Sequence, residues 1–231
     1  MTDTGATEAA RPDTAGTAVW GIGQYVDDTG TRHDWEVGND EIGRAIGAAP
    51  AVLGGLAVVR GERVLFASML SEAAHFWPLI LGAMLSGAQM SFTDASRGEA
   101  VRVRMFTRLL AYRAAIGITP AILDGLDELG TPYPAVFGEV PVVAARPGAY
   151  ERLAAAGLAP YDFVLAGPAV AIATEPGGPA WVDPDEWELD SDADDTVTVT
   201  ARRARATGFT RVRTDVRGAI VDGHGIVPAR S

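Results

Sequence analysis

Hydrophobic positions recur with two different periods along this chain. Between residues 40 and 156, short apolar runs alternate with segments whose apolar residues follow the helical period. We therefore expect strands and helices in turn, with Thr119 as the N-cap of one helix. The predicted strands are 63–68, 89–93, 114–118 and 140–144, and the predicted helices are 40–48, 72–85, 97–112, 120–129 and 149–156. This alternation is typical of parallel strands joined by helical crossovers.

The two flanking parts differ from this middle. Near the start, the turn residues Asp27-Asp28-Thr29-Gly30 separate runs at 23–26 and 32–37, which predicts a β-hairpin. After Tyr161 the helical period is lost. Strands are expected at 163–166, 170–173, 181–189, 196–201, 210–214 and 218–221, with a hairpin turn at 222–225. The predicted fold class is α/β: a mainly parallel sheet with helical crossovers, followed by a strand-rich C-terminal part.

The expected domain organisation follows the same change in period. Residues 1–18 form a polar tract that predicts a disordered tail, 19–160 form the α/β scaffold, and 161–231 form a strand-rich subdomain packed on it or continuous with it. The tract lacks the apolar segment of a signal peptide. The apolar run 76–85 contains Pro78 and is shorter than the roughly 20 residues of a membrane span. A cytoplasmic protein without a membrane segment is expected.

Charge and composition exclude several classes of function. The formal net charge of −11 disfavours binding to nucleic acid or to an anionic lipid surface. The 231 residues include neither lysine nor cysteine, so arginine accounts for all 19 lysine and arginine positions. This excludes a Schiff base, covalently bound pyridoxal phosphate, a Walker-type lysine, a thiol nucleophile and a thiolate zinc site within this sequence.

Several blocks in order carry a resemblance to a known family. The block V-V-R-G-E-R-V-L-F-A-S at 58–68, followed by an amphipathic helix and S-G-A at 86–88, resembles the opening of the adenylate-forming enzymes, the acyl-CoA synthetase and ligase superfamily. The segments 157–161, 166–168, 173–178 and 181–188 are similar to the branch typified by phenylacetate-coenzyme A ligase. The segments 196–200 and 210–218 resemble that family's strand pair ending in R-Y-R-T-G-D. The resemblance covers 36–221.

The sequence also departs from the family pattern. Members carry a Ser/Thr/Gly-rich loop ending in Pro-Lys that wraps the ATP phosphates, and no such segment precedes Gly167 here. A second lysine of the family lies in a C-terminal domain that would begin near Ser231. The resemblance therefore implies a shortened scaffold without ATP chemistry, and ATP-dependent ligase activity is not expected. An arginine cannot replace the backbone cradle of the missing loop.

The resemblance also suggests ligand-binding residues. Asp215 matches the family aspartate that binds both ribose hydroxyls of the nucleotide, although it could instead pair with Arg213 or Arg217. Glu175 could orient a ligand or cap the turn at 176–178. The expected ligand-binding set is Asp215, Arg213, Gly167, Pro168, Thr174 and Glu175.

Other polar groups give weaker signals. Asp190-x-Asp192-x-Asp194 begins like a calcium-binding EF-hand loop but lacks its glycine and final glutamate, so no metal site is expected. Ser71 and His75 share one helix face, where a surface pair is expected, and no catalytic residue is assigned. One arginine cluster could bind phosphate or coenzyme A, or could neutralise the acidic run before it: Arg202, Arg203, Arg205, Arg211, Arg213 and Arg217.

Three functions remain open. The first is a catalytically degenerate relative of AMP-dependent acyl-CoA ligases, which binds an acyl, acyl-CoA or nucleotide-like ligand or partners a complete ligase. The second is a lysine-free enzyme that uses the acyl pocket for hydrolysis or elimination with carboxylate acid/base residues. The third is a structural oligomerisation module whose contact surface is the apolar region 76–92 together with the C-terminal half, which has almost no predicted helix. No cofactor is expected, although AMP or a coenzyme A moiety could be the ligand, and a homo-oligomer is expected.

Overall fold

The computed structural model describes residues 18–230. The tail expected over 1–18 lies outside the described residues, apart from Ala18. The strands are β1 (Val19–Val26), β2 (Arg32–Gly38), β3 (Arg63–Ala67), β4 (Gln89–Thr93), β5 (Ala114–Ile118), β6 (Val142–Ala145), β7 (Tyr161–Ala166), β8 (Ala169–Ala173), β9 (Ala180–Trp181), β10 (Trp187–Ser191), β11 (Thr196–Ala201), β12 (Val212–Val221) and β13 (Gly225–Pro228).

The helices lie almost entirely in the first two thirds of the chain. They are α1 (Asn39–Gly55), α2 (Ala73–Leu85), α3 (Ala100–Leu109), α4 (Pro120–Glu128), α5 (Tyr133–Phe137) and α6 (Ala149–Ala155), with short 3-10 turns at Leu70–Glu72 and Arg97–Glu99. Thr119 caps α4 as predicted, because its hydroxyl oxygen accepts the N–H of Ile122 over 3.3 Å. No helix between residues 18 and 230 is long and apolar enough to cross a membrane.

Eleven of the strands form one sheet, in the order β10-β11-β12-β13-β9-β8-β7-β6-β5-β3-β4. The strands from β4 to β7 in this order pair in parallel, and those from β7 to β10 pair antiparallel. The predicted fold class is therefore confirmed. The change of direction falls at β7, which begins at Tyr161, the position where the helical period ends in the sequence.

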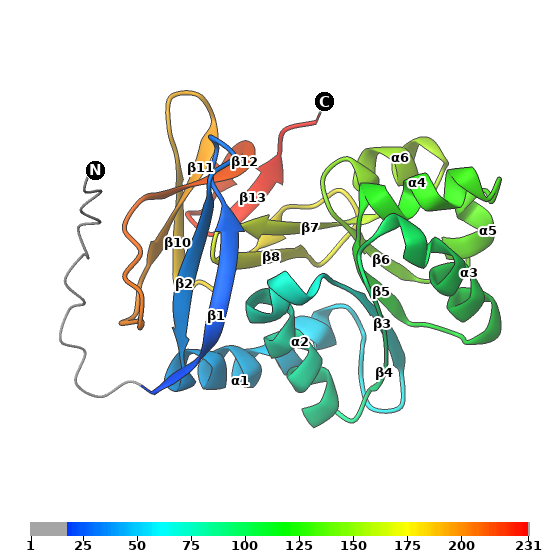
Figure 1. The fold of residues 1–231 in the computed structure, drawn as a ribbon, viewed down its shortest axis with the longest axis horizontal. Helices are drawn as coiled ribbons and strands as arrows, with labels where there is room; N and C mark the ends of the chain where they lie inside the picture. Colours follow the sequence, from blue (N-terminus) through cyan, green and yellow to red (C-terminus); the bar gives the residue numbers. More distant parts are fainter. Residues whose placement is uncertain (1–17, 231) are drawn as a thin grey trace, which may run out of the picture.

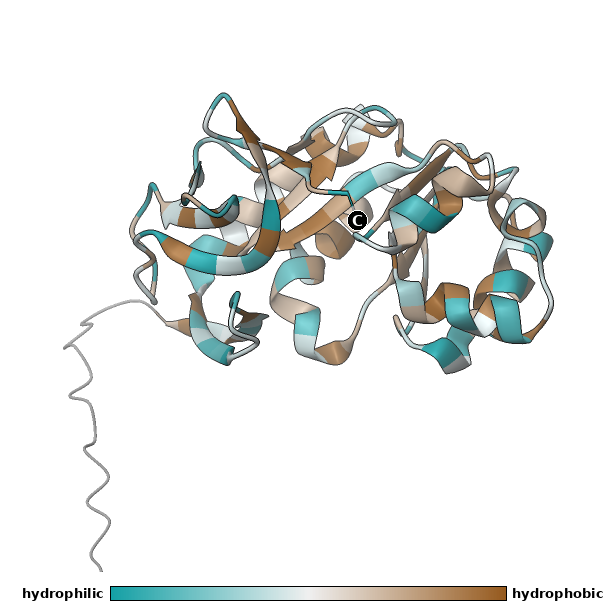
Figure 2. Cartoon of the chain, turned by 90° about the horizontal axis from the view of Figure 1, so that it is seen from above, coloured by the Kyte–Doolittle hydropathy of each residue, from teal (hydrophilic) through white to brown (hydrophobic). Residues whose placement is uncertain are grey.

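Alternating side chains of the parallel strands enter two cores. Val64 and Phe66 of β3 pack with α1 and α2 on one face, whereas Leu65 and Ala67 pack with α3 to α6 on the other. The helices therefore cover both faces of this part of the sheet (Figure 1). Hydrophobic residues colour its strands brown in Figure 2, while the helices carry hydrophilic residues on their outer surfaces. This arrangement requires strands that are apolar on both sides.

The hairpin β1–β2 stands apart as a two-stranded sheet (Figure 1). Its turn is held by Asp27, whose Oδ1 accepts the N–H groups of Thr29 and Thr31 over 2.9 and 3.0 Å. Trp35 of β2 is buried in a third core with residues of the C-terminal strands. A side chain at Gly23 would overlap the Trp35 ring. The predicted hairpin is confirmed, and its packing closes one side of the antiparallel half.

Some predicted elements have different bounds. The strand predicted at 181–189 is two strands, β9 and β10, because a turn begins at Asp183, whose carbonyl accepts the N–H of Trp187 over 3.0 Å. The strands predicted at 210–214 and 218–221 are the single strand β12. Helix α1 continues through Pro50, since Ala49 and Leu53 are buried against α2. Helix α5 was not predicted.

Candidate functional site

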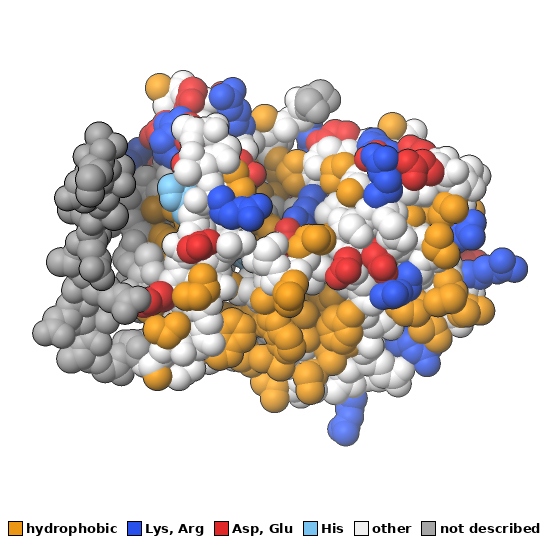
Figure 3. Space-filling view, in the orientation of Figure 1, with side chains coloured by type: hydrophobic (Ala, Val, Ile, Leu, Met, Phe, Trp, Pro, Cys, Tyr) orange, Lys and Arg blue, Asp and Glu red, His pale blue; other side chains and the backbone are white. Residues whose placement is uncertain are grey.

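A cleft of about 740 Å³ lies where the ends of several strands meet the hairpin. Thr119 follows β5 and Arg146 follows β6, so both lie at the carboxyl ends of parallel strands, where open α/β sheets generally bind ligands. Strand β12 contributes Asp215 and Arg217, and β2 contributes Arg32. Arginine side chains lie in the hollow between the hairpin and the helical part in Figure 3. The cleft is thus built by both halves of the sheet and by the hairpin.

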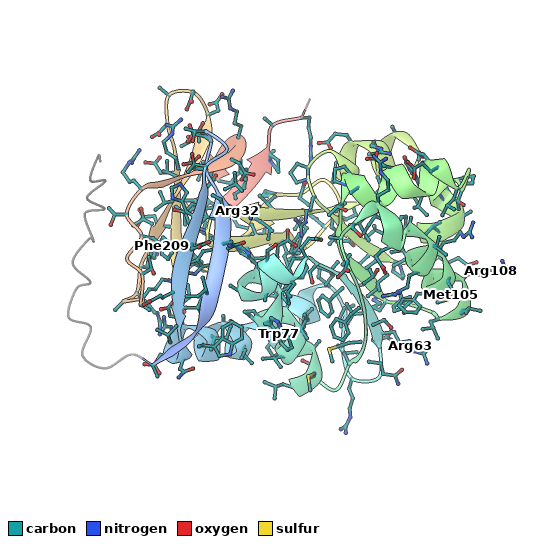
Figure 4. All side chains as sticks on the ribbon, viewed as in Figure 1. Arg32, Arg63, Trp77, Met105, Arg108 and Phe209 are labelled. Carbon is teal, nitrogen blue, oxygen red and sulfur yellow. The ribbon has the colours of Figure 1, made fainter. Side chains whose placement is uncertain are left out.

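The lining of the cleft is basic, in contrast to the whole sequence. Arg32, Arg146, Arg217 and Arg230 line it with only two carboxylates, although the chain has a formal net charge of −11. Arg230 is neutralised by Asp162 through two hydrogen bonds of 2.9 and 2.6 Å. Arg32, which lies on the hairpin (Figure 4), and Arg217 form no ion pair with any residue that the structure describes. Two guanidinium groups are therefore available to an anionic ligand.

Glu72 and Arg146 form a doubly hydrogen-bonded ion pair in the cleft. The two terminal nitrogens of Arg146 donate to the Glu72 carboxylate over 2.5 and 2.6 Å, and each side chain is only 17% exposed. Burial alone would raise the pKa of Glu72, but the hydrogen bonds and charge of Arg146 outweigh it, so this pKa lies below its ordinary value. The N–H of Met69 also donates to Glu72 over 2.8 Å. The pair is therefore fixed at the start of α2.

His75 lies one helical turn further along and is fully enclosed. Its Nε2 donates to the carbonyl oxygen of Gly167 over 2.8 Å, and its ring packs edge-on against Trp35. Desolvation by burial is the main reason that the pKa of His75 is lowered to about 4. Its Nδ1 has no hydrogen-bond partner among the described residues. His75 is therefore a neutral imidazole with one unused acceptor.

The Asp215 carboxylate forms no ion pair with any residue between 18 and 230. Asp215 stays accessible to solvent, yet the protein atoms of the cleft displace enough water to raise the pKa of its carboxyl group. The charge of Arg146 opposes this shift without cancelling it. The predicted alternative, pairing with Arg213 or Arg217, is wrong for the described residues. Asp215 can therefore accept hydrogen bonds from a ligand or carry a proton.

A second, apolar pocket of about 540 Å³ adjoins the cleft. Helices α1 and α2, strand β8 and the rings of Trp35 and Trp181 supply most of its wall. His75 lines both cavities, so it forms part of the boundary between them. A ligand with an anionic group and an apolar group therefore finds both environments side by side.

Comparison with known proteins gives matches at the level of structure alone. No family model matches the chain, and no curated protein matches it. The open conformation of 2-hydroxyisobutyryl-CoA ligase, solved with 2-HIB-AMP and CoA, matches with a TM-score of 0.66 and 13% identity, over 91% of this chain and 56% of that one. The chain has the fold of the adenylate-forming acyl-CoA ligases.

Two further solved structures support this assignment of the fold. A double mutant of o-succinylbenzoate CoA synthetase (MenE) from Bacillus subtilis, bound with its product analogue OSB-NCoA, matches with a TM-score of 0.61 and 11% identity, over 92% of this chain and 49% of that one. The N-terminal subdomain of Klebsiella oxytoca NpsA, in complex with 3-hydroxyanthranilyl-AMSN, matches with a TM-score of 0.57 and 12% identity, over 90% and 61%. The chain spans 49–61% of the length of these three solved chains, and identities this low show the fold alone.

Within this acyl-ligase fold, the six expected ligand-binding residues separate. Asp215 and Gly167 line the cleft, and Pro168 and Thr174 line the apolar pocket. Glu175 is exposed, and its carbonyl oxygen accepts the N–H of Gly178 over 3.3 Å, which closes a turn. Of the two roles expected for Glu175, the structure therefore agrees with the one in the turn. The sixth residue lies outside both cavities.

That residue, Arg213, belongs to a surface network of charges. It donates to Asp28 over 2.8 and 3.0 Å, to Asp194 over 2.9 Å, and also to Asp192. Its neighbour Arg211 donates to Asp190 over 2.5 Å and to Asp192 over 2.9 Å. Arg202, Arg203 and Arg205 pair with carboxylates at positions 185–188 in the same way. The expectation that the arginine cluster neutralises the acidic run at 183–195 is therefore confirmed for all its members except Arg217. Among residues 18–230, no group of three or more potential metal ligands is close enough to hold an ion.

Four charged residues of the cleft were not expected at a site from the sequence: Arg32, Glu72, Arg146 and Arg230. The sequence could have indicated Arg146 as a site residue, because it directly follows a buried strand and therefore lies at the carboxyl edge of the parallel sheet. Ser71 and His75 both line the cleft, but His75 is buried and donates a hydrogen bond to Gly167. His75 is therefore not the surface residue that its helix position predicted.

Proposed function

We propose that the chain binds a small anionic acyl compound, of the acyl-CoA or acyl-adenylate class, without carrying out ATP-dependent ligation. The observation that carries the proposal is the pair Arg32 and Arg217, which face the cleft without a carboxylate partner among the described residues. A phosphate or carboxylate group would supply the missing negative charge. The adjoining apolar pocket suits the acyl part of the same ligand.

Two further observations support this ligand class. Asp215 has an unpaired carboxylate that can accept two hydrogen bonds from a ribose diol, which is the role implied by the sequence resemblance. The structural relatives include proteins solved with 2-HIB-AMP, CoA and OSB-NCoA. The absence of lysine from the sequence, together with the absence of a phosphate loop before Gly167, supports the loss of ligation.

A thermal-shift titration tests the proposal. The probes are AMP, coenzyme A, an acyl-CoA and a non-hydrolysable acyl-adenylate analogue. At least one acyl-bearing anion is expected to raise the Tm, because a ligand that binds only the native state stabilises it. Arg217→Gln and Arg32→Gln should each weaken that ligand by about tenfold or more, which is typical for loss of a hydrogen bond to a charged group. If none of the probes moves the Tm, the proposal fails.

A matched control separates the cleft from general surface charge. Arg108 is an exposed arginine on α3, far from the cleft lining (Figure 4). Arg108→Gln removes the same charge and should leave the Kd of the acyl ligand unchanged. Release of pyrophosphate from ATP, magnesium and carboxylic acids, above a blank without protein, would contradict the proposed loss of ligation.

The second candidate function is a lysine-free reaction, hydrolysis or elimination, in the same cleft. Asp215 favours it, because a carboxyl group with a raised pKa can act as an acid or base nearer neutral pH. Turnover of an acyl-CoA by the purified protein, abolished in Asp215→Asn while the Kd changes little, would assign this role. The absence of turnover across a panel of acyl-CoAs would leave binding as the function.

A role beside a complete ligase rests on the sequence resemblance, and co-purification with such an enzyme would test it.

A further inference from the structure

Strand β4 forms one edge of the eleven-stranded sheet, and its outer side is unpaired among the described residues. The N–H of Gln89 donates to Glu62 over 2.8 Å, and the carbonyl of Thr93 accepts from Ser68 over 3.1 Å. Residues 89, 91 and 93 therefore bond towards β3. Because the direction alternates along a strand, the N–H and C=O groups of Met90 and Phe92 point away from the sheet.

The two edges of the sheet differ in how they are protected. The opposite edge, β10, exposes Glu188 and Asp190, and charged side chains discourage pairing with another strand. Strand β4 reads Gln-Met-Ser-Phe-Thr and carries no charge. This edge therefore offers an unprotected template for a further strand.

Exposed apolar side chains surround the same edge. Phe92 is 48% exposed, although its ring stacks on Phe66, and Trp77 of α2 is 41% exposed beside it. Leu70, at 87% exposure, lines the same groove of about 360 Å³. Figure 3 shows a continuous hydrophobic patch over α2, and Figure 4 places Trp77 on this helix. A patch of this kind marks an interaction surface.

We propose that β4 pairs antiparallel with β4 of a second copy of this chain, with Ser91 at the two-fold axis. This register places Met90 of each copy opposite Phe92 of the other. These are the two residues whose backbone groups point outwards, so each Met90–Phe92 pair forms two hydrogen bonds. The side chains of each pair lie on the same face, beside α2, where the exposed Trp77 rings become covered.

Charge complementarity in this register favours a second copy over another partner. Asp94 of one copy lies opposite Ala88 of the other. Arg60 packs beside Gly87, and Arg63 donates to Gln89 over 2.9 Å, so both arginines lie near that position. None of Asp94, Arg60 and Arg63 forms an ion pair with a residue of its own copy between 18 and 230. Because the two-fold axis repeats each contact, the dimer contains two places where Asp94 of one copy lies near Arg60 and Arg63 of the other.

The oligomeric state of the full chain tests this proposal. Sedimentation velocity and light scattering across a concentration series should give a dimer. Phe92→Lys places a positive charge on the edge of both copies and should reduce the mass to that of a monomer. Met90→Pro removes an outward N–H without touching a bond to β3, and should have the same effect. Ile22→Lys, at an exposed strand position on the hairpin, is the matched control and should remain dimeric.

A charge exchange tests the register itself. Asp94→Arg and Arg63→Asp should each shift the equilibrium towards monomer, and the double variant should restore part of the dimer. A monomeric wild-type chain, or a dimer that survives Phe92→Lys, would overturn the proposal. Phe92 does not line the cleft, so Phe92→Lys should show the same ligand-induced rise in Tm as the wild-type chain. The dimer proposal and the ligand-binding proposal can therefore fail separately.

Discussion

His75 and Gly167 are joined by a hydrogen bond of 2.8 Å that connects α2 to the turn between β7 and β8. A carbonyl oxygen can only accept, so the His75 Nε2 carries the proton. The donor belongs to the helical part of the chain and the acceptor to its strand-rich part. This contact therefore links the two parts at the boundary between the cleft and the apolar pocket, where burial keeps the imidazole neutral although the hydrogen bond itself favours the protonated form.

The stability of the fold should fall as the pH drops from about 6.5 to about 4. The unfolded histidine takes a proton near pH 6.5, whereas folded His75 does so only at about 4, so the unfolded state binds more protons between these values. The contribution is complete above pH 6.5 and is lost as the pH falls. It amounts to at most roughly 3 kcal/mol, from the difference between the two pKa values.

Urea unfolding at several pH values measures this effect. His75→Gln keeps a side-chain donor but has no titrating group, so its stability should depend less on pH between about 6.5 and 5. Parallel loss of stability in both proteins over that range would show that the buried imidazole is not responsible.

The ion pair of Glu72 and Arg146 should contribute more to stability than a surface pair. Glu72→Gln or Arg146→Met leaves a mostly buried charge without its partner, which costs about 3–5 kcal/mol at fully buried sites. Since both side chains are 17% exposed, we expect on the order of 2 kcal/mol for each change. The double variant should lose less than the sum of the two. Additive losses in a double-mutant cycle would contradict the pairing.

Local signals predicted the elements of the fold more fully than they predicted the site. Thr119 and Pro120 are adjacent in the sequence and together mark the start of α4. The turn at Asp27 likewise joins two consecutive strands of one hairpin, so both features depend only on neighbouring residues. The helix predicted over 40–48 continues to Gly55, because Leu53 is buried against α2. Long-range packing decided that position.

The site depends almost wholly on long-range contacts. Arg146 and Glu72 come from different helical crossovers, and Asp215 comes from a strand in the other half of the sheet. Nothing near Arg213 and Asp215 in the sequence indicates which of the two faces the cleft. The hairpin turn decides it, because Asp28 binds Arg213 outside the cleft.

Replacement of Arg213 should therefore leave ligand binding intact. Its partners Asp28, Asp192 and Asp194 form a network on the surface, where salt screens the interaction. Arg213→Gln should lower the Tm slightly at low salt and leave it unchanged at high salt, with the same Kd for any ligand that Arg217→Gln weakens. A loss of affinity in Arg213→Gln equal to that in Arg217→Gln would return Arg213 to the site.

Two glycine-to-alanine changes should have opposite effects on stability. In an exposed helix, alanine is more stable than glycine by about 1 kcal/mol. Gly43 of α1 is exposed with no atom near the position of a Cβ, so Gly43→Ala should raise the free energy of unfolding by up to about that amount. Gly82 of α2 instead lies where a Cβ would overlap that of Ala49 in α1. Gly82→Ala should therefore lower the free energy of unfolding by about 1–3 kcal/mol, because the two helices must separate. Denaturation curves of the two variants measure the difference, and a rise for both would mean that α1 and α2 do not meet at Gly82.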